Sequence, residues 1–102
     1  MIRMSNSCDK YRKAAVVFET AATALYRMAT DNPLRTKVEF DALVYASSVL
    51  ENVSAEINAT EFNLVDVTEY ILNMLVGFEM PSYIESMVDN VLRGVSRAIS
   101  SL

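Results

Sequence analysis

The sequence contains very little glycine and proline, with only two residues of each type among its 102. A sandwich or barrel of short strands needs a turn about every 8–12 residues, and glycine and proline dominate such turns. Hydrophobic residues make up 52% of the chain, which is enough to build a core in one domain. This composition disfavours an all-β fold and favours long helices joined by few connections.

The sequence also contains no histidine, and Cys8 is its only cysteine. Histidine is the commonest general base and metal ligand in proteins, and a structural zinc site needs a cluster of cysteine and histidine. Gly77 and Gly94 stand alone, so the chain has no glycine-rich loop that could bind a phosphate. We therefore expect a protein that is not an enzyme, with no cofactor, no metal ion and no small-molecule substrate.

Long hydrophobic runs are missing as well. No stretch approaches the roughly 18 apolar residues that a membrane-spanning helix requires. The first ten residues, MIRMSNSCDK, lack the apolar core of a secretory signal, and one cysteine cannot form an internal disulfide. We expect no membrane association and a cytoplasmic location.

The charges of the chain are unevenly distributed around a net value of −4. Residues 1–37 carry seven basic and three acidic side chains, whereas residues 38–102 carry ten acidic and two basic ones. No basic residue lies between Glu39 and Asp89. The C-terminal two thirds could therefore either balance the basic N-terminal helix or present an acidic face to a basic partner.

Lys10, Arg12 and Lys13 form the one basic cluster of the sequence. On a helix these positions spread over more than half a turn, so they cannot all face one groove. The acidity of the whole chain also opposes the attraction to phosphates that supplies most nucleic-acid affinity. We do not expect the protein to bind nucleic acid.

Hydrophobic residues recur at spacings of three and four, which predicts helices at about residues 7–29, 36–57, 63–76 and 82–102. The fold class is therefore all-α, as a four-helix bundle or two helical hairpins in a single domain, completed by oligomerisation. Asp31-Asn32-Pro33 ends the first helix, because the residue before proline is pushed out of the helical region. The predicted starts rest on cap-type side chains: Ser5, Asn6 and Ser7, the capping boxes Thr36/Glu39 and Ser82/Glu85, and Asn63.

The four helices differ in the width of their apolar faces. Much of the stripe of helix 7–29 is alanine, which allows a neighbouring helix to approach closely. Helix 63–76 is apolar over well over half of its circumference and should be buried on several sides. In helix 82–102, Gly94 and Ala98 could admit another helix. Helix 36–57 has one broad apolar face, composed of Val38, Ala42, Leu43, Tyr45, Ala46, Val49, Leu50, Val53 and Ile57.

Phe40 and Val44 fall outside that broad face and lie four residues apart, beside Ser47, Ser48 and Glu51. We expect these two apolar side chains to contact a second protein molecule. A 102-residue monomer offers little surface to cover all of its helices, so the sequence indicates an oligomeric interaction module, most simply a homodimer.

A second hypothesis assigns the acidic part of the chain to a basic protein partner. The protein would then act as an inhibitor, an immunity protein or a secretion-type chaperone. The acidic residues of helices 36–57 and 63–76 and their connection would contribute most: Glu51, Glu56, Glu61, Asp66 and Glu69. The sequence does not decide between the two hypotheses.

Overall fold

A computed structural model describes residues 2–59 and 64–102 of the chain. These residues form the helices α1 (Ile2–Thr30), α2 (Lys37–Ala59), α3 (Leu64–Val76) and α4 (Ser82–Ser100), with no strand in either described range. The predicted all-α fold class is confirmed. The molecule is elongated, with extents of 52 × 24 × 22 Å.

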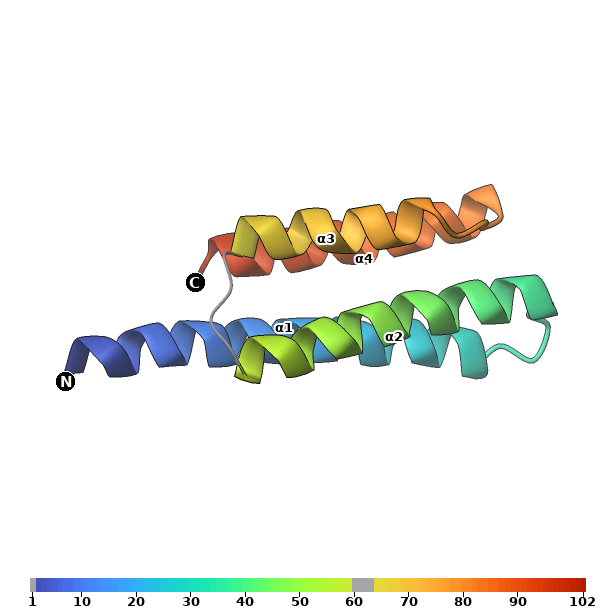
Figure 1. Ribbon diagram of the computed structural model, residues 1–102. Coiled ribbons are helices and arrows are strands. Elements are labelled where there is room, and N and C mark those ends of the chain that lie inside the picture. Colours follow the sequence, from blue (N-terminus) through green and yellow to red (C-terminus); the bar gives the residue numbers. More distant parts are fainter. Residues whose placement is uncertain (1, 60–63) are drawn as a thin grey trace.

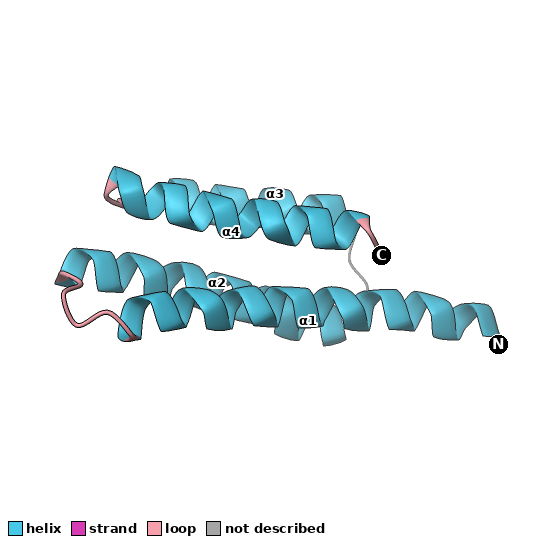
Figure 2. Cartoon of the chain, turned by 180° about the vertical axis from the view of Figure 1, so that it is seen from behind, coloured by secondary structure: helices cyan, strands magenta, loops and turns pink. Residues whose placement is uncertain are grey.

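The helices form two stacked hairpins, with α1 and α2 in one layer and α3 and α4 in the other (Figure 1). Consecutive helices run antiparallel, so both chain termini lie at the same end of the bundle. In the part of the chain that the structure describes, α1 packs most extensively on α2, while α4 packs on α1 and α2, and α3 packs on α2. Figure 2 shows the same two layers from behind, with the N-terminal turns of α1 extending past the end of α2.

The helix boundaries follow the prediction closely except at the N-terminus. Helix α1 begins at Ile2 rather than near residue 7, so the predicted cap residues Ser5, Asn6 and Ser7 lie inside the helix. Serine and asparagine cost only a few tenths of a kcal/mol in a helix interior, which is too little to fix where a helix starts. The end of α1 is as predicted, because the helix stops at Thr30 and the Asn32 side chain then accepts a hydrogen bond from the Leu34 backbone N–H (3.0 Å).

One of the two predicted capping boxes forms. The Glu39 carboxylate accepts a hydrogen bond from the Thr36 backbone N–H (2.9 Å), and the Thr36 hydroxyl accepts one from the Glu39 backbone N–H (3.2 Å). These bonds, the backbone one first, hold the pKa of Glu39 below its ordinary value, and the neighbouring Arg35 lowers it further. The start of α2 is therefore fixed by the residues that the sequence singled out.

The capping box predicted at Ser82 and Glu85 is wrong. Pro81 is the N-cap of α4, Ser82 is already inside the helix, and no side chain bonds to this helix end. The backbone N–H of Glu85, which the Ser82 hydroxyl would have to bond, instead donates to the Pro81 carbonyl (3.0 Å). Because Pro81 takes the N-cap position, the helix starts at Ser82 as predicted but without a serine cap.

The core is densest between α1 and α2, where small residues face each other. Ala14, Ala15, Ala22, Ala42 and Ala46 are all buried there or beside it. Alanine lets two helices approach closely, as the sequence predicted for the first helix. Larger side chains complete the layer, with Phe18, Leu25, Leu43, Leu50 and Ile57 among the most deeply buried.

Two serines cross this close contact. The Ser47 hydroxyl donates to the Ala22 carbonyl and the Ser54 hydroxyl to the Ala15 carbonyl, each at 2.7 Å. Both partners step by seven residues in opposite directions, which fixes one antiparallel register for the whole hairpin. The sequence interpretation placed Ser47 on the outer side of α2, and this is wrong: Ser47 is buried. Serine is mostly found on protein surfaces, so its burial cannot be predicted unless the position of a hydrogen-bonding carbonyl on the next helix is known.

Val38 and Tyr45 were also expected on the buried face of α2. Val38 is instead 59% exposed, because it lies in the first turn of α2, where little of the second layer covers it. Tyr45 is half-buried, stacks on Phe78 with ring centroids 4.3 Å apart, and donates a hydrogen bond to the Met74 carbonyl (3.1 Å). Tyr45 thus joins α2 to the end of α3.

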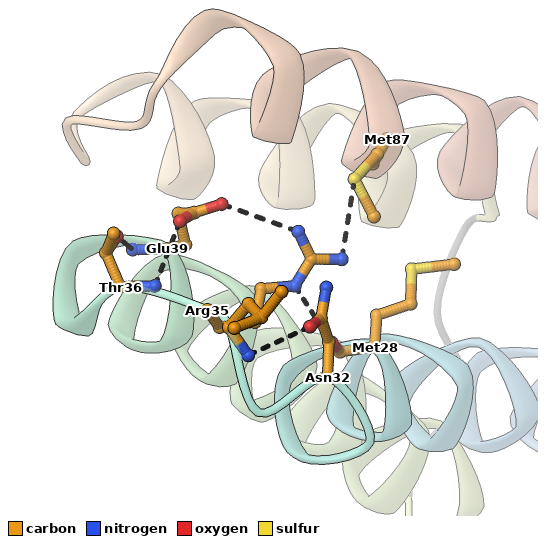
Figure 3. Close-up of polar contacts among 7 residues, drawn as sticks. Met28, Asn32, Arg35, Thr36, Glu39 and Met87 are labelled. Carbon is orange, nitrogen blue, oxygen red and sulfur yellow. Dashed lines mark hydrogen bonds and ion pairs between the residues drawn. The ribbon is translucent and has the colours of Figure 1, made fainter.

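Arg35 forms the second polar link between the layers (Figure 3). Its guanidinium donates to the Met28 carbonyl at the end of α1 (3.1 Å) and pairs with Glu39 of α2 (3.4 Å). It also reaches the Met87 sulfur of α4 at 4.0 Å. One side chain in the α1–α2 connection therefore contacts three helices, and no buried side-chain nitrogen or oxygen in the described ranges lacks a hydrogen-bond partner.

Candidate interaction surfaces

Helix α3 is less covered than its composition predicted. Val67, Ile71 and Leu75 are buried against the first layer, but Tyr70 (51%) and Leu72 (43%) are exposed. One chain therefore does not bury this helix on several sides, and cover of its other sides by a second molecule stays a prediction. Helix α3 occupies a corner of the bundle, where only α2 packs closely against it among the described residues. Tyr70, Leu72 and Met74 of this helix belong to the large apolar side chains that stay exposed in the described chain.

The predicted contact residues Phe40 and Val44 both lie on α2. Phe40 is 38% exposed, whereas Val44 is half-buried and packs against the core. The Ser47–Ala22 hydrogen bond shows why Val44 is partly covered: the edge of α2 that carries it is the edge nearest α1. Phe40 is the more accessible member of the predicted pair.

The predicted acidic residues are only partly brought together. Glu56 of α2 and Asp66 of α3 line one hollow of about 430 Å³ together with Ile57 and Tyr70. Glu51 and Glu69 are exposed but do not line this hollow. Glu61 falls outside the described residues. The structure thus joins two of the five acidic residues, from two different helices.

A second hollow, which sequence reasoning missed, lies between α3, α4 and the start of α2. This groove of about 670 Å³, here called the α3–α4 groove, has the buried side chains of Leu75 and Val88 at its base. Its more exposed apolar lining comes from all three elements: Val38, Leu72, Phe78, Met80 and Leu92. The sequence had assigned Val38 and Leu72 to buried faces, so its only signal of this groove was an apolar surface too large for one chain to cover.

The charged residues of the α3–α4 groove are all acidic. Glu79 lies in the connection between the two helices, and Glu85 and Asp89 lie one turn apart on α4. Arg93 does not line the groove, but it pairs with Asp89 on the helix surface at 3.0 Å. The groove therefore combines an apolar base with carboxylates of one sign.

A third hollow, of about 820 Å³, lies along the outer side of α1 and the α1–α2 connection. Its charged lining contains both signs, from Glu19 and Asp31 and from Arg27 and Arg35. These opposite charges can balance one another, so this hollow has no preference for an anionic or a cationic partner.

The described part of the chain contains neither a cluster of metal ligands nor a membrane-spanning helix. No group of three His, Cys, Asp or Glu side chains converges there as a metal ion would require. No helix there is both long enough and apolar enough to cross a membrane.

Comparison of the chain with models of known protein families, with curated proteins and with solved structures gave no match.

Proposed function

We propose that this protein is a non-catalytic interaction module, which acts as a homodimeric adaptor or structural component in the cytoplasm. The observation that carries the proposal is the apolar surface of the second layer and of the start of α2. Large apolar side chains remain exposed there: Val38, Phe40, Tyr70, Leu72, Met74 and Tyr83.

Covering such a surface would provide a substantial driving force for association. A stable dimer buries about 800 Å² per partner, and each Å² of apolar surface contributes about 25 cal/mol before the costs of association are subtracted. These residues come from α2, α3 and α4, so a partner that covered one of α2 together with one of α3 or α4 would also hold the two layers together. Dimerisation would thus stabilise the less tightly packed layer of the fold.

The oligomeric state can be measured directly by light scattering on the purified protein. One chain has a mass of 11.4 kDa, so a homodimer should give about twice this value at micromolar concentration. A mass of one chain at high micromolar concentration would rule out the homodimer and leave a different protein as the partner.

Substitution of Phe40 and Val44 by serine tests the predicted contact pair. If both contact a second molecule, the double variant should remain helical by circular dichroism while its association weakens. Val16→Ser, at a more exposed apolar side chain (56%, against 38% for Phe40) on the outer side of α1, is the control and should leave the mass unchanged. A loss of helical signal in the double variant would instead assign Val44 to the core alone.

An alternative function is recognition of a basic protein through the acidic part of the chain, as an inhibitor, immunity protein or secretion-type chaperone would do. Glu56 and Asp66, which converge on one hollow from two helices, favour it. Affinity purification from the native host with mass spectrometry would identify such a partner. Its association rate should fall with salt, and Glu56→Lys with Asp66→Lys should slow it further, because surface charges act mainly on encounter. An association rate that is unaffected by both the salt concentration and the charge reversal would contradict this alternative.

A further inference from the structure

The α3–α4 groove has the composition of a peptide-binding site. Its base, formed by Leu75 and Val88, is buried, and its lining becomes more exposed outward through Leu72 and Val38. A volume of about 670 Å³ accommodates several apolar side chains of a ligand. The groove can therefore take apolar anchors from a partner without first opening the core.

The charge of the groove selects among possible occupants. Glu79, Glu85 and Asp89 are its only charged lining residues, and all are acidic. A second copy that placed the same groove face to face would bring six carboxylates together, which like-charge repulsion opposes. An anionic segment is disfavoured for the same reason. A cationic segment would gain from the carboxylates of Glu79 and Glu85, and from that of Asp89 when it joins or replaces the exposed ion pair with Arg93.

The geometry favours a helix as the shape of the occupant. The groove runs between two antiparallel helices, and a third helix fits such a site when its apolar residues recur at spacings of three, four and seven. The carboxylates of Glu85 and Asp89 lie one helical turn apart, which matches the spacing of lysine or arginine one turn apart on the occupant. Apolar anchors and cationic side chains can thus engage the groove together.

We propose that the α3–α4 groove binds a basic amphipathic helix of a partner protein, through apolar anchors on Leu72, Leu75 and Val88 and cationic side chains on Glu79, Glu85 and Asp89. This inference rests on the proposed role as an interaction module, but it does not require that the chain form a homodimer. It also assigns the acidic recognition surface to residues other than those that the sequence suggested.

Fluorescence anisotropy with a synthetic probe tests the proposal on the full chain. The probe is a labelled peptide of about five turns, built from leucine and lysine with leucine on one helical face. One control peptide has the same composition in scrambled order, and a second has glutamate in place of lysine. We expect saturable binding of the amphipathic basic peptide alone. Equal binding of the scrambled peptide would overturn the proposal, because it would show a general attraction to positive charge.

Matched charge variants locate the peptide on the protein. Glu79→Gln with Glu85→Gln should weaken binding about tenfold, since each removes one carboxylate from the groove. Glu19→Gln with Asp31→Asn changes the net charge equally, but both residues line the hollow beside α1 and not the groove, and this variant should weaken binding by less than about twofold. Equal effects of the two variants would place the peptide outside the groove.

Leu72→Ser tests the apolar contact, with Val16→Ser as the matched control away from the groove. We expect Leu72→Ser to weaken peptide binding about tenfold and Val16→Ser to leave it unchanged.

The mass of each variant is measured by light scattering in parallel. If Leu72→Ser instead converts a dimer into a monomer, and peptide binding competes with dimerisation, the occupant is a second copy and the proposal is wrong. If the wild type is a monomer that binds the peptide, the proposed homodimer is wrong and the proposed binding of a basic helix in the groove is supported.

Discussion

The two hairpins of this protein achieve their packing in different ways. The α1–α2 hairpin brings alanines together and fixes its register with two buried serine hydroxyls, Ser47 and Ser54, on opposing carbonyls. The α3–α4 hairpin carries larger side chains, and the described residues of α3 and α4 pack less on each other than on the first layer. Small residues therefore let α1 and α2 pack closely on each other, whereas the second hairpin keeps large apolar side chains exposed.

Truncation of a leucine in each hairpin should give the largest contrast. Leu43 of α2 is fully buried, so Leu43→Ala should reduce the free energy of unfolding by about 2–5 kcal/mol. Leu72 of α3 is 43% exposed, and Leu72→Ala should cost less than about 1 kcal/mol in the monomer. Urea denaturation followed by circular dichroism measures both values. Similar losses would show that the second hairpin is packed as tightly as the first.

Removal of the serine hydroxyls tests the register of the first hairpin. Ser47→Ala and Ser54→Ala should each cost about 1 kcal/mol, because each removes one buried hydrogen bond. The matched control is Ser96→Ala on the exposed side of α4, which should change the stability by less than about 0.5 kcal/mol. If the two buried changes are as small as the control, alanine packing by itself fixes the hairpin.

Substitution of Gly94 in the second hairpin should raise the stability of the protein, whereas the substitutions above lower it. The sequence suggested that Gly94 admits a neighbouring helix, but a Cβ atom at this position would meet no atom within 4 Å. Gly94→Ala should therefore stabilise the monomer by about 1 kcal/mol, the difference in helix propensity between the two residues. Thermal unfolding at low protein concentration measures this effect. A loss of stability that grows with protein concentration would place Gly94 in an interface between chains.

The smallest predicted effect concerns the pH dependence of the start of α2. The pKa of Glu39 is lowered from its ordinary value of 4.5, chiefly by the hydrogen bond from the Thr36 backbone N–H. The carboxylate therefore stabilises the folded state above pH 4.5, and this contribution is lost as the pH falls through the lowered pKa. Glu39→Gln should be less stable than the wild type at neutral pH, and the difference should shrink in acid. A difference that stays constant down to pH 3 would show that the carboxylate charge is not involved.

The sequence determined the local features of the fold. The end of α1 before Pro33, the capping box of Thr36 and Glu39 and the alanine stripe of α1 each depend on a few neighbouring residues, and all three were predictable. The start of α4 at Ser82 was also predictable, but its capping box was not, because Pro81 takes the N-cap position before Ser82 can act as a cap. Such features follow from backbone geometry and hydrogen bonding within one or two turns of a helix.

Only the tertiary structure decided which apolar and polar residues face a neighbour. Ser47 is buried because a carbonyl of α1 lies opposite it, and Val38 and Leu72 are exposed because no helix of the chain covers that side of α2 and α3 among the described residues. The α3–α4 groove depends on residues from three elements that are distant in the sequence, so helical periodicity could not reveal it. Hydrophobic periodicity gives the direction in which a side chain points from its own helix, but the burial of that side chain depends on where the other helices lie.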